Sequence, residues 1–329
     1  MILDGNDPAA IAAAAQALRA GELVGLPTET VYGLGADAGS DAAVAKIFAA
    51  KGRPADHPLI VHVADVADAE HFAREVPDFA RKLMQTFWPG PLTLILPRRP
   101  EVGASAAGGQ DSIGLRCPSH PVAQALLRAA RGLGVHGVAA PSANKFGRVS
   151  PTTAQHVREE FGDGLLILDG GACEVGIEST IIDCTRGAPV LLRPGRITRD
   201  EVQSVCGMPL RDKDDLAAPA PRASGTLESH YAPHAKVRLM DAAQLQAALD
   251  VLGGDAAALG LAVYARALLS VPAGVRLQRM PDDAAAAAHE LFAALRAFDA
   301  QGAKLIWIEA PPASPEWEGV RDRLTRAAA

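Results

Sequence analysis

The sequence has few cysteines, four in 329 residues, and no two of them form a C-x-x-C pair. This spacing gives no support for a zinc ribbon or a thioredoxin-like redox motif. Widely separated cysteines in a long chain favour reduced, mostly buried thiols, as in the cytosol. Near the N-terminus, Asp4 and Asp7 stand where a signal peptide would carry positive charge. We therefore expect a cytoplasmic protein.

A surplus of basic residues is also missing, and so are long hydrophobic runs. The net charge is −6, and the first 206 residues carry 19 basic and 23 acidic side chains. Because contact with a phosphate backbone needs a basic surplus, this balance argues against a general nucleic-acid binder. Apolar stretches fall short of the roughly 20 residues that a membrane-spanning helix needs, so we expect no membrane association.

Familiar nucleotide and metal motifs are missing as well. The sequence contains no G-x-x-x-x-G-K-[ST] motif, and its glycines at 33, 35 and 39 miss the G-x-G-x-x-G spacing by one residue. Ser142 lacks the G-x-S-x-G context of a hydrolase nucleophile. Pro233 lies between His230 and His234 and disfavours a helical metal pair there, so we expect no protein metal site.

What the sequence does contain is an alternation of helical and strand-like segments. Helical patterns cover 8–20, 41–51 (with Asp41 as N-cap), 77–87 and 121–131, and Ser150-Pro151 resembles an N-cap followed by a first helical residue. Strand-like segments include 22–26, 58–63, 91–97 and 113–117. Several strands follow each other too closely for parallel crossovers, so we expect an α/β fold with a twisted mixed sheet.

The length predicts about two domains of roughly 150 residues each. Residues 207–234 are rich in proline, aspartate, serine and glycine and show no periodicity, which is typical of a linker. Strands and helices alternate again from residue 235 and indicate a small α/β domain. The expected division is therefore 1–206, a linker over 207–234, and 235–329.

The run from residue 27 to residue 62 combines a hydroxyl-rich turn, a glycine-spaced loop, a helix and the sequence Lys51-Gly52-Arg53-Pro54. Lysine and arginine beside a small residue can hold phosphate or bicarbonate. A second interpretation fits equally well, because cations favour helix C-termini and glycine favours the C′ position. Local sequence leaves both interpretations open.

Other polar residues also allow two interpretations. Arg116 lies in an apolar strand, so it is expected either to bind a carboxylate ligand or to form a structural ion pair. His62 is either a ligand contact or a core histidine. Ser142 and Asn144 suit a nucleotide but are also common in loops.

Three further sites are equally ambiguous. Ser150 can meet an anion at a helix N-terminus or simply cap that helix. The polar strand start at 176–180 is either functional or solvated. Arg193 either contacts a ligand or is exposed on a turn.

Together these segments resemble the YrdC/Sua5 family. The motifs PTETVYGLG, KGRPADHPLIVH, FWPGPLTLIL, GLRCPSHP, APSANKFGRVSPTTAQHV, GIESTIID and LLRPG occur in the order expected of that family. The resemblance covers about residues 8–200 and extends through ASGTLESHYAP to a Sua5-type C-terminal domain with a Rossmann-like α/β fold. It therefore implies a YrdC-like domain at 1–206 and a Sua5-type domain at 235–329.

The resemblance implies an L-threonylcarbamoyladenylate synthase, which is a nucleotidyltransferase. Such an enzyme uses L-threonine, bicarbonate and ATP with Mg²⁺, and releases pyrophosphate. A tRNA threonylcarbamoyl transferase complex then uses the product at position 37 of tRNAs that read ANN codons. Because the chain is acidic, we expect a functional link to that complex without stable tRNA binding.

The resemblance also implies roles for individual residues. The central catalytic group would be Lys51, Arg53, Ser142 and Asn144. The threonine pocket would contain Thr30, His62, Arg116, Ala140 and Thr180. The ATP contacts would be Arg53, His57, Ser112, Ser142, Ser150, Arg193 and Tyr231. The segment ASGTLESHYAP lacks a Lys-Tyr pair that some members carry, so Tyr231 is the contact expected from the linker, which is also expected to close the site.

Two other functions compete with this one. The chain could be a non-catalytic RNA-binding module, although its charge argues against that. It could also resemble the carbamoyl-adenylate-forming enzymes of hydrogenase maturation, but these carry C-x-x-C zinc fingers, which are missing here.

Overall fold

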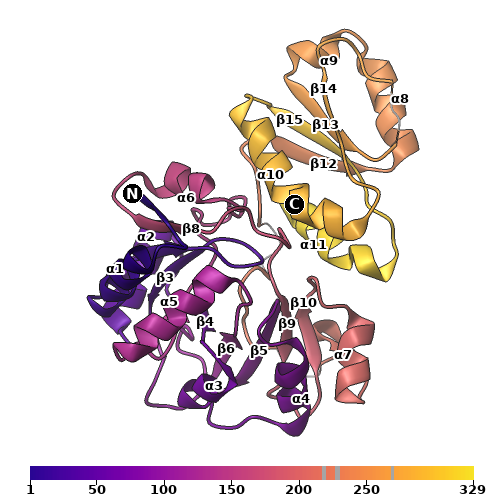
Figure 1. Ribbon diagram of the computed structural model, residues 1–329. Coiled ribbons are helices and arrows are strands. Elements are labelled where there is room, and N and C mark those ends of the chain that lie inside the picture. The colour runs from indigo at the N-terminus through magenta and orange to yellow at the C-terminus, as the bar shows by residue number, and fades with distance from the viewer. Residues whose placement is uncertain (217–219, 227–229, 268–269) are drawn as a thin grey trace. The chain divides into compact units, whose positions relative to one another are not determined.

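The computed structural model describes residues 1–216, 220–226, 230–267 and 270–329. The chain forms two compact units, which Figure 1 shows in sequence colours. Unit 1 comprises Met1–Phe146 and Ser150–Thr226, and unit 2 comprises Gly147–Val149 and Leu227–Ala329. Most of the segment predicted as a linker thus belongs to unit 1. In the described part of the chain, no helix has the length and apolarity needed to cross a membrane.

Unit 1 is built on one mixed sheet, which within the described residues has eleven strands in the order β1-β8-β2-β3-β7-β4-β6-β5-β9-β10-β11. Parallel pairs such as β4 with β6 stand beside antiparallel pairs such as β5 with β6, so the predicted mixed sheet is confirmed. The strands are β1 (Ile2–Asp4), β2 (Val24–Leu26), β3 (Gly33–Asp37), β4 (Ile60–His62), β5 (Leu92–Pro97), β6 (Ser112–Arg116), β7 (Val138–Ala139), β8 (Leu166–Asp169), β9 (Thr180–Asp183), β10 (Val190–Arg193) and β11 (Arg211–Asp212).

Helices cover the sheet of unit 1 on both faces. They are α1 (Pro8–Arg19), α2 (Asp41–Lys51), α3 (Val66–Phe72), α4 (Asp78–Phe87), α5 (Pro121–Gly132), α6 (Ala154–Phe161) and α7 (Arg199–Cys206), with a short 3₁₀ turn at Lys213–Asp215. One apolar core joins α2, α4 and α7 to residues such as Val61, Leu115 and Ile182. On the opposite face, α1 and α5 pack together over residues such as Leu26 and Val138.

Helices α1 and α5 cover only part of that second face, and a different segment of the chain covers the rest. Successive strand residues point to opposite faces, so Ile60 lies on the face opposite Val61 and beside its partner Ala140. Ile60 belongs to an apolar group with Ile95, Ile181, Val190 and Leu192, against which Leu216, Ala220 and Ala223 pack. A segment predicted as linker therefore covers the half of this face that α1 and α5 leave open.

Three local predictions for unit 1 are wrong. The N-cap of α2 is Ser40, whose hydroxyl accepts from the Ala43 N–H, so Asp41 is its first helical residue. The helix expected to begin at Ser150-Pro151 begins at Ala154, because Thr153 supplies the cap by accepting from the His156 N–H. The glycine-spaced loop is largely strand β3, whose residues pair with β2.

Unit 2 is a small α/β unit with a four-stranded sheet in the described residues, ordered β12-β15-β13-β14, and its strand pairs are parallel. Its elements are β12 (Lys236–Met240), α8 (Ala242–Leu252), α9 (Asp255–Ala258), β13 (Leu261–Ala265), β14 (Arg276–Arg279), α10 (Ala284–Ala300), β15 (Leu305–Glu309), a 3₁₀ turn at Pro315–Trp317, and α11 (Glu318–Ala327). The parallel order fits the Rossmann-like expectation. The edge strand β14 escaped prediction because its sequence, RLQR, is mostly polar and largely exposed.

Three residues from the middle of the sequence also belong to unit 2. The Ala232 N–H donates to the carbonyl oxygen of Gly147 at 2.9 Å, and Arg296 Nη2 donates to that of Val149 at 2.5 Å. Arg148 lies 3.8 Å from Asp299, one helical turn from Arg296 on α10. The chain therefore leaves unit 1 after Phe146 and returns at Ser150.

Candidate active site

The C-terminal end of α2 brings two cations into the interior of unit 1. Gly52 caps this helix with φ 65°, the left-handed conformation that glycine favours, so the predicted cap is confirmed. Lys51 Nζ donates to the carbonyl oxygen of Ser142 at 2.6 Å and to that of Asn144. The same turn therefore holds Lys51 against the segment that carries Ser142 and Asn144.

Lys51 is buried, with 3% of its surface exposed. Burial lowers the pKa of its ammonium well below the ordinary value for lysine, and the positive charge of Arg53 lowers it further. The carboxylates of Glu160 and Glu178 act in the opposite direction. An incoming polyphosphate would add negative charge and raise the pKa of Lys51, which favours its charged form.

Arg53 and Arg193 meet at Ser224. Arg53 Nη2 donates to Ser224 Oγ at 3.0 Å and to the Pro58 carbonyl at 2.8 Å. Arg193 donates from Nη1 to the Ser224 carbonyl at 2.9 Å, and from Nε and Nη2 to the Ser179 carbonyl. Arg193 is 2% exposed, so the interpretation that placed it on an exposed turn is wrong. The two guanidinium groups therefore lie close together, and both residues are buried.

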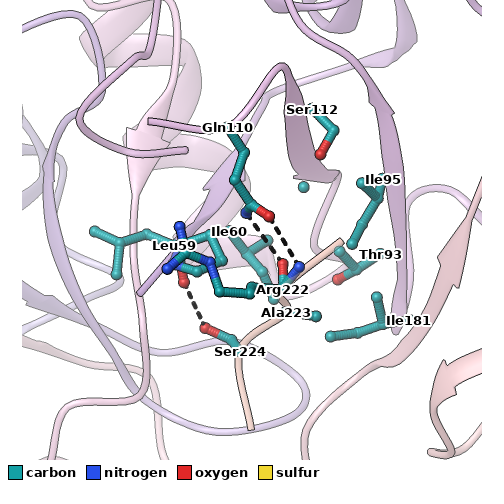
Figure 2. A pocket seen from close by; sticks show the side chains of 12 residues that line it. Leu59, Ile60, Thr93, Ile95, Gln110, Ser112, Ile181, Arg222, Ala223 and Ser224 are labelled. Atoms are coloured by element: carbon teal, nitrogen blue, oxygen red, sulfur yellow. Dashed lines mark hydrogen bonds between the residues drawn. The ribbon is translucent and has the colours of Figure 1, made fainter. Parts of the chain in front are cut away.

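A pocket lies next to this pair, and Figure 2 shows the side chains around it. Ser112, an expected ATP contact, lines the pocket, and Arg222–Ser224 form part of its wall. The Arg222 N–H donates to Gln110 Oε1 at 2.9 Å, and Gln110 Nε2 donates to the Arg222 carbonyl at 3.2 Å. Arg222 also pairs with Asp56 at 2.6 Å. The other residues that line the pocket are Pro58, Leu59, Ile60, Thr93, Ile95, Gly114 and Ile181.

Arg116 forms a second polar group with Glu29 and His62. Arg116 Nη2 lies 2.8 Å from Glu29 Oε1, and both side chains are almost fully buried. The Ser119 N–H donates to Glu29 Oε2 at 3.2 Å. His62 is the register partner of Arg116 in the parallel pair of β4 with β6, so the two side chains share one face of the sheet. The ion pair that was one expectation for Arg116 exists, and it lies beside His62, which was also considered as a ligand contact.

His62 is 3% exposed, which agrees with the core interpretation of this residue. Burial lowers the pKa of its imidazole to about 3, and the neighbouring charge of Arg116 contributes to this shift. The ring is therefore neutral at pH 7, with one nitrogen that donates and one that accepts. Among the described residues, Nδ1 has no hydrogen-bond partner.

The buried imidazole predicts an acid-sensitive fold. Because the pKa of His62 falls from 6.5 to about 3 on folding, the unfolded chain binds an extra proton between those values. The free energy of unfolding then decreases as the pH falls, by about 1.4 kcal/mol per pH unit. Urea unfolding at pH 7 and pH 5 should show a loss about 2 kcal/mol smaller for His62→Gln than for the wild type. The exposed His289→Gln is the control, and equal losses in all three proteins would contradict the assignment.

The remaining expected threonine contacts are buried, but not all are available through their side chains. Thr30 Oγ1 lies 2.9 Å from Thr28 Oγ1, whose own proton goes to a backbone carbonyl. Ala140 is buried beside β4. Thr180 Oγ1 donates to the Ile197 carbonyl at 2.8 Å and accepts from the Ile197 N–H at 3.1 Å. The structure therefore directs the Thr180 hydroxyl to the backbone at Ile197.

Ser150 and His57 flank the cationic group. Ser150 Oγ donates to Glu178 Oε1, and both residues are buried, so neither the cap role of Ser150 nor the solvated strand start is correct. The His57 ring packs edge-on against Phe146, with ring centroids 5.4 Å apart, and the Arg53 guanidinium lies 5.8 Å from the same ring. Partial burial and the charge of Arg53 lower the pKa of His57.

Tyr231 is placed in unit 2 rather than in unit 1. Its ring is 1% exposed and lies 5.4 Å from the Phe292 ring, with the Arg323 guanidinium also 5.4 Å from its centre. It is the one described residue other than glycine with a positive φ, 62°. All the expected site residues except Tyr231 belong to unit 1.

Sequence reasoning missed several residues of this region. The linker was expected to contribute Tyr231 alone, but Arg222 and Ser224 also line the pocket. Ser224 in addition accepts hydrogen bonds from Arg53 and Arg193. Ser224 lies within ASGTLESHYAP, and Glu29 lies within PTETVYGLG, so both were inside motifs already singled out. No sequence pattern indicated a role for Gln110, because its partner Arg222 is 112 residues away.

Comparison with known proteins identifies relatives over the whole chain. Residues 16–195 match the Sua5/YciO/YrdC family model, described as Telomere recombination, and residues 197–329 match the model described as Threonylcarbamoyl-AMP synthase, C-terminal domain. The Threonylcarbamoyl-AMP synthase of Bacillus subtilis (strain 168) is 46% identical over 244 residues, 73% of this chain and 68% of the relative. That of Pyrococcus abyssi is 46% identical over 234 residues, 69% of this chain and 67% of the relative.

Two solved structures of the P. abyssi Sua5 protein have the same fold. One is a double-alanine variant, with a TM-score of 0.90 and 35% identity over 100% of this chain and 96% of that chain. The other is complexed with L-threonine, with a TM-score of 0.88 and 36% identity over 97% and 94% of the two chains. With both family models matched and close relatives along its length, the chain belongs to the Sua5/YciO/YrdC family and carries the Sua5-type C-terminal domain.

Proposed function

We propose that this protein is an L-threonylcarbamoyladenylate synthase, which joins L-threonine, bicarbonate and ATP and releases pyrophosphate. The supporting observation is that unit 1 holds two separate buried charge groups. Lys51, Arg53 and Arg193 form a cationic group suited to phosphates, and Arg116 with Glu29 forms a neutral pair suited to an amino acid. The names of the relatives support the same activity.

The reaction needs no nucleophile from the enzyme. The threonine amine adds to bicarbonate, losing a proton and expelling water, and gives a carbamate. A carbamate oxygen then attacks the α-phosphorus of ATP, and the bond to the leaving pyrophosphate breaks. Catalysis therefore depends on bringing anionic groups together and on neutralising charge that develops on phosphate oxygens. Buried lysine and arginine side chains suit both tasks.

The residues divide into three sets under this proposal. Lys51, Arg53, Ser142 and Asn144 surround the reacting phosphate and carbamate. The threonine pocket consists of Thr30, His62, Arg116, Ala140 and Thr180, with Thr180 contributing its backbone because its hydroxyl is bound to Ile197. ATP contacts come from Arg53, His57, Ser112, Ser142, Ser150 and Arg193.

We propose that Mg²⁺ binds together with ATP. Among the residues that the structure describes, no three His, Cys, Asp or Glu side chains are grouped to hold a metal ion. Mg²⁺ commonly keeps several waters and is held through substrate phosphates, where it neutralises charge. The residues here do not form a dedicated cage, so we assign the ion to the ATP phosphates.

The product would be consumed by a tRNA threonylcarbamoyl transferase complex, which adds the group to adenosine 37 of tRNAs reading ANN codons. We place this reaction in the cytoplasm. The acidic charge of the chain supports a transient link to that complex without stable tRNA binding. A non-catalytic RNA-binding module is not favoured, because the relatives are named as enzymes.

Pyrophosphate release tests the proposed function. The full-length protein is incubated with ATP, bicarbonate, Mg²⁺ and L-threonine, and pyrophosphate is followed with a coupled assay. Release should require both L-threonine and bicarbonate. Release that does not depend on threonine would refute the substrate assignment. A carbamoyl-adenylate-forming activity would instead require a carbamoyl donor in place of L-threonine.

We also propose that the segment Arg222–Ser224 helps to close the ATP site. Gln110→Ala removes both hydrogen bonds to the Arg222 backbone and should raise the KM for ATP about threefold to tenfold, with little change in thermal stability. The exposed Gln155→Ala is the matched control. An unchanged KM for ATP would contradict this role, as would unchanged ATP affinity and turnover after deletion of residues 207–329.

A further inference from the structure

An irregularity in strand β10 decides which face of the sheet carries Arg193. Leu191 pairs regularly with β9, but the next register partner of β9 is Arg193 opposite Ile181, so Leu192 is one extra residue, as in a β-bulge. In a regular strand Leu192 and Arg193 would point to opposite faces. The bulge brings Arg193 opposite Ile181, and its hydrogen bond to the pocket residue Ser224 places it on the pocket side.

Two buried hydroxyl groups lie beside Arg193. Thr93 of β5 is the register partner of Ile181 on the other side of β9, so Thr93 and Arg193 flank the same residue. Thr93 Oγ1 lies 2.7 Å from Ser179 Oγ, and Arg193 Nη2 donates to Ser179 Oγ at 3.1 Å. Both hydroxyl residues are fully buried. The three side chains therefore form a continuous chain from Thr93 through Ser179 to Arg193, and Thr93 also lines the pocket (Figure 2).

Hydrogen-bonding chemistry fixes the order of the protons along this chain. A guanidinium group can only donate, so Ser179 Oγ is the acceptor in its bond with Arg193. The Ser179 hydroxyl has one proton of its own, and among the described residues Thr93 Oγ1 is the acceptor within reach. Because a buried proton without an acceptor is costly, Ser179 donates to Thr93. The proton of Thr93 is then available to a molecule in the pocket, which Ser179 does not line.

The hydrogen bonds of Arg193 show what this support achieves. Its Nε and Nη2 donate to the Ser179 carbonyl at 3.0 and 2.9 Å, and Nη2 also reaches Ser179 Oγ. The two acceptors of Ser179 hold one edge of the guanidinium plane and direct Nη1 to the Ser224 carbonyl at 2.9 Å. Ser224 Oγ accepts from Arg53 at 3.0 Å. The orientation of Arg193 therefore determines how the two cations meet at Ser224.

We propose that Thr93 and Ser179 are positioning residues for Arg193, which binds the phosphates of ATP. The Thr93 oxygen holds the Ser179 hydroxyl in the orientation that faces the guanidinium. Without it the Ser179 proton loses its acceptor, and Ser179 Oγ turns away from Arg193 to find another. This inference rests on the proposed function, because it concerns the cationic group of the same site. It adds two residues that act on ATP binding through a third.

Binding of ATP and of inorganic tripolyphosphate to the full-length protein, measured by isothermal titration calorimetry, tests the assignment. Tripolyphosphate carries phosphates without a base, so it reports on the cationic group rather than on the pocket. Thr93→Val replaces the hydroxyl by a methyl group and should weaken tripolyphosphate binding by about threefold to tenfold. Thr93→Ser keeps the hydroxyl and should restore most of the wild-type affinity. Thr86→Val, which removes an exposed hydroxyl on α4, is the matched control and should bind as the wild type does.

A double-mutant cycle with Arg193→Met separates positioning from a purely structural role. In the Arg193→Met background, Thr93→Val should change tripolyphosphate affinity by less than about twofold, because the residue through which it acts is gone. Additive losses would overturn the inference, and so would unchanged affinity in Thr93→Val or no restoration by Thr93→Ser. If Thr93→Val does not fold, Ser179→Ala takes its place in the cycle with the same expectation. A wild type that binds neither ATP nor tripolyphosphate would refute the proposed function as well.

Discussion

Lys51→Ala should lower kcat/KM for pyrophosphate release by about a hundredfold to a thousandfold, the loss typical of removing one charge-stabilising donor from a reaction centre. Burial lowers the pKa of Lys51 well below its ordinary value, and the arriving phosphates would restore its charge where negative charge develops. Arg53 is a separate donor, whose Nη2 is bound to the Pro58 carbonyl and to Ser224 Oγ.

The experiment must separate chemistry from folding, because Lys51 also binds the carbonyl oxygens of Ser142 and Asn144. Lys46→Ala, on the same helix but with 45% of its side chain exposed, is the matched control and should keep wild-type turnover. Thermal unfolding of each variant reports its stability. A folded Lys51→Ala protein that retains more than about a tenth of wild-type activity would refute the assigned role.

Arg116→Met should have two large effects, which a second substitution can separate. Loss of the guanidinium leaves Glu29 as an unpaired buried carboxylate, which should lower the free energy of unfolding by about 3–5 kcal/mol. It also removes the partner of the substrate carboxylate, so L-threonine affinity should fall by about tenfold or more. The stability effect comes from the ion pair, and the affinity effect comes from ligand binding.

The double variant Arg116→Met with Glu29→Gln distinguishes the two roles. It removes both charges, so much of the lost stability should return in urea unfolding, while L-threonine binding stays weak in calorimetry. Recovery of threonine affinity together with stability would mean that Arg116 acts only as half of a structural ion pair. Arg81→Met, which breaks an exposed pair with Glu70, is the control and should change neither quantity appreciably.

Local chemistry explains which features could be predicted from the sequence. The cap at Gly52 depends on one residue that adopts φ 65° readily. The short links between strands predicted the mixed sheet, and the order of the motifs indicated the family. The cap role predicted for Ser150 was wrong because a serine before a proline is typical of a helix N-cap. In the structure its hydroxyl donates to Glu178, 28 residues away. Ser224 lies 171 residues from Arg53, and periodicity says nothing about pairs so distant.

The excursion of Gly147–Val149 into unit 2 has a consequence for any shortened form of this protein. A fragment that ends near residue 206 would retain Ser142, Asn144 and Ser150 in full. It would lose Ala232, Arg296 and Asp299, which bind the intervening three residues. Such a fragment would contain every reacting-centre residue proposed for unit 1, but part of the loop between Asn144 and Ser150 would lack its hydrogen-bond partners. Limited proteolysis of the fragment should therefore cut first beside Arg148.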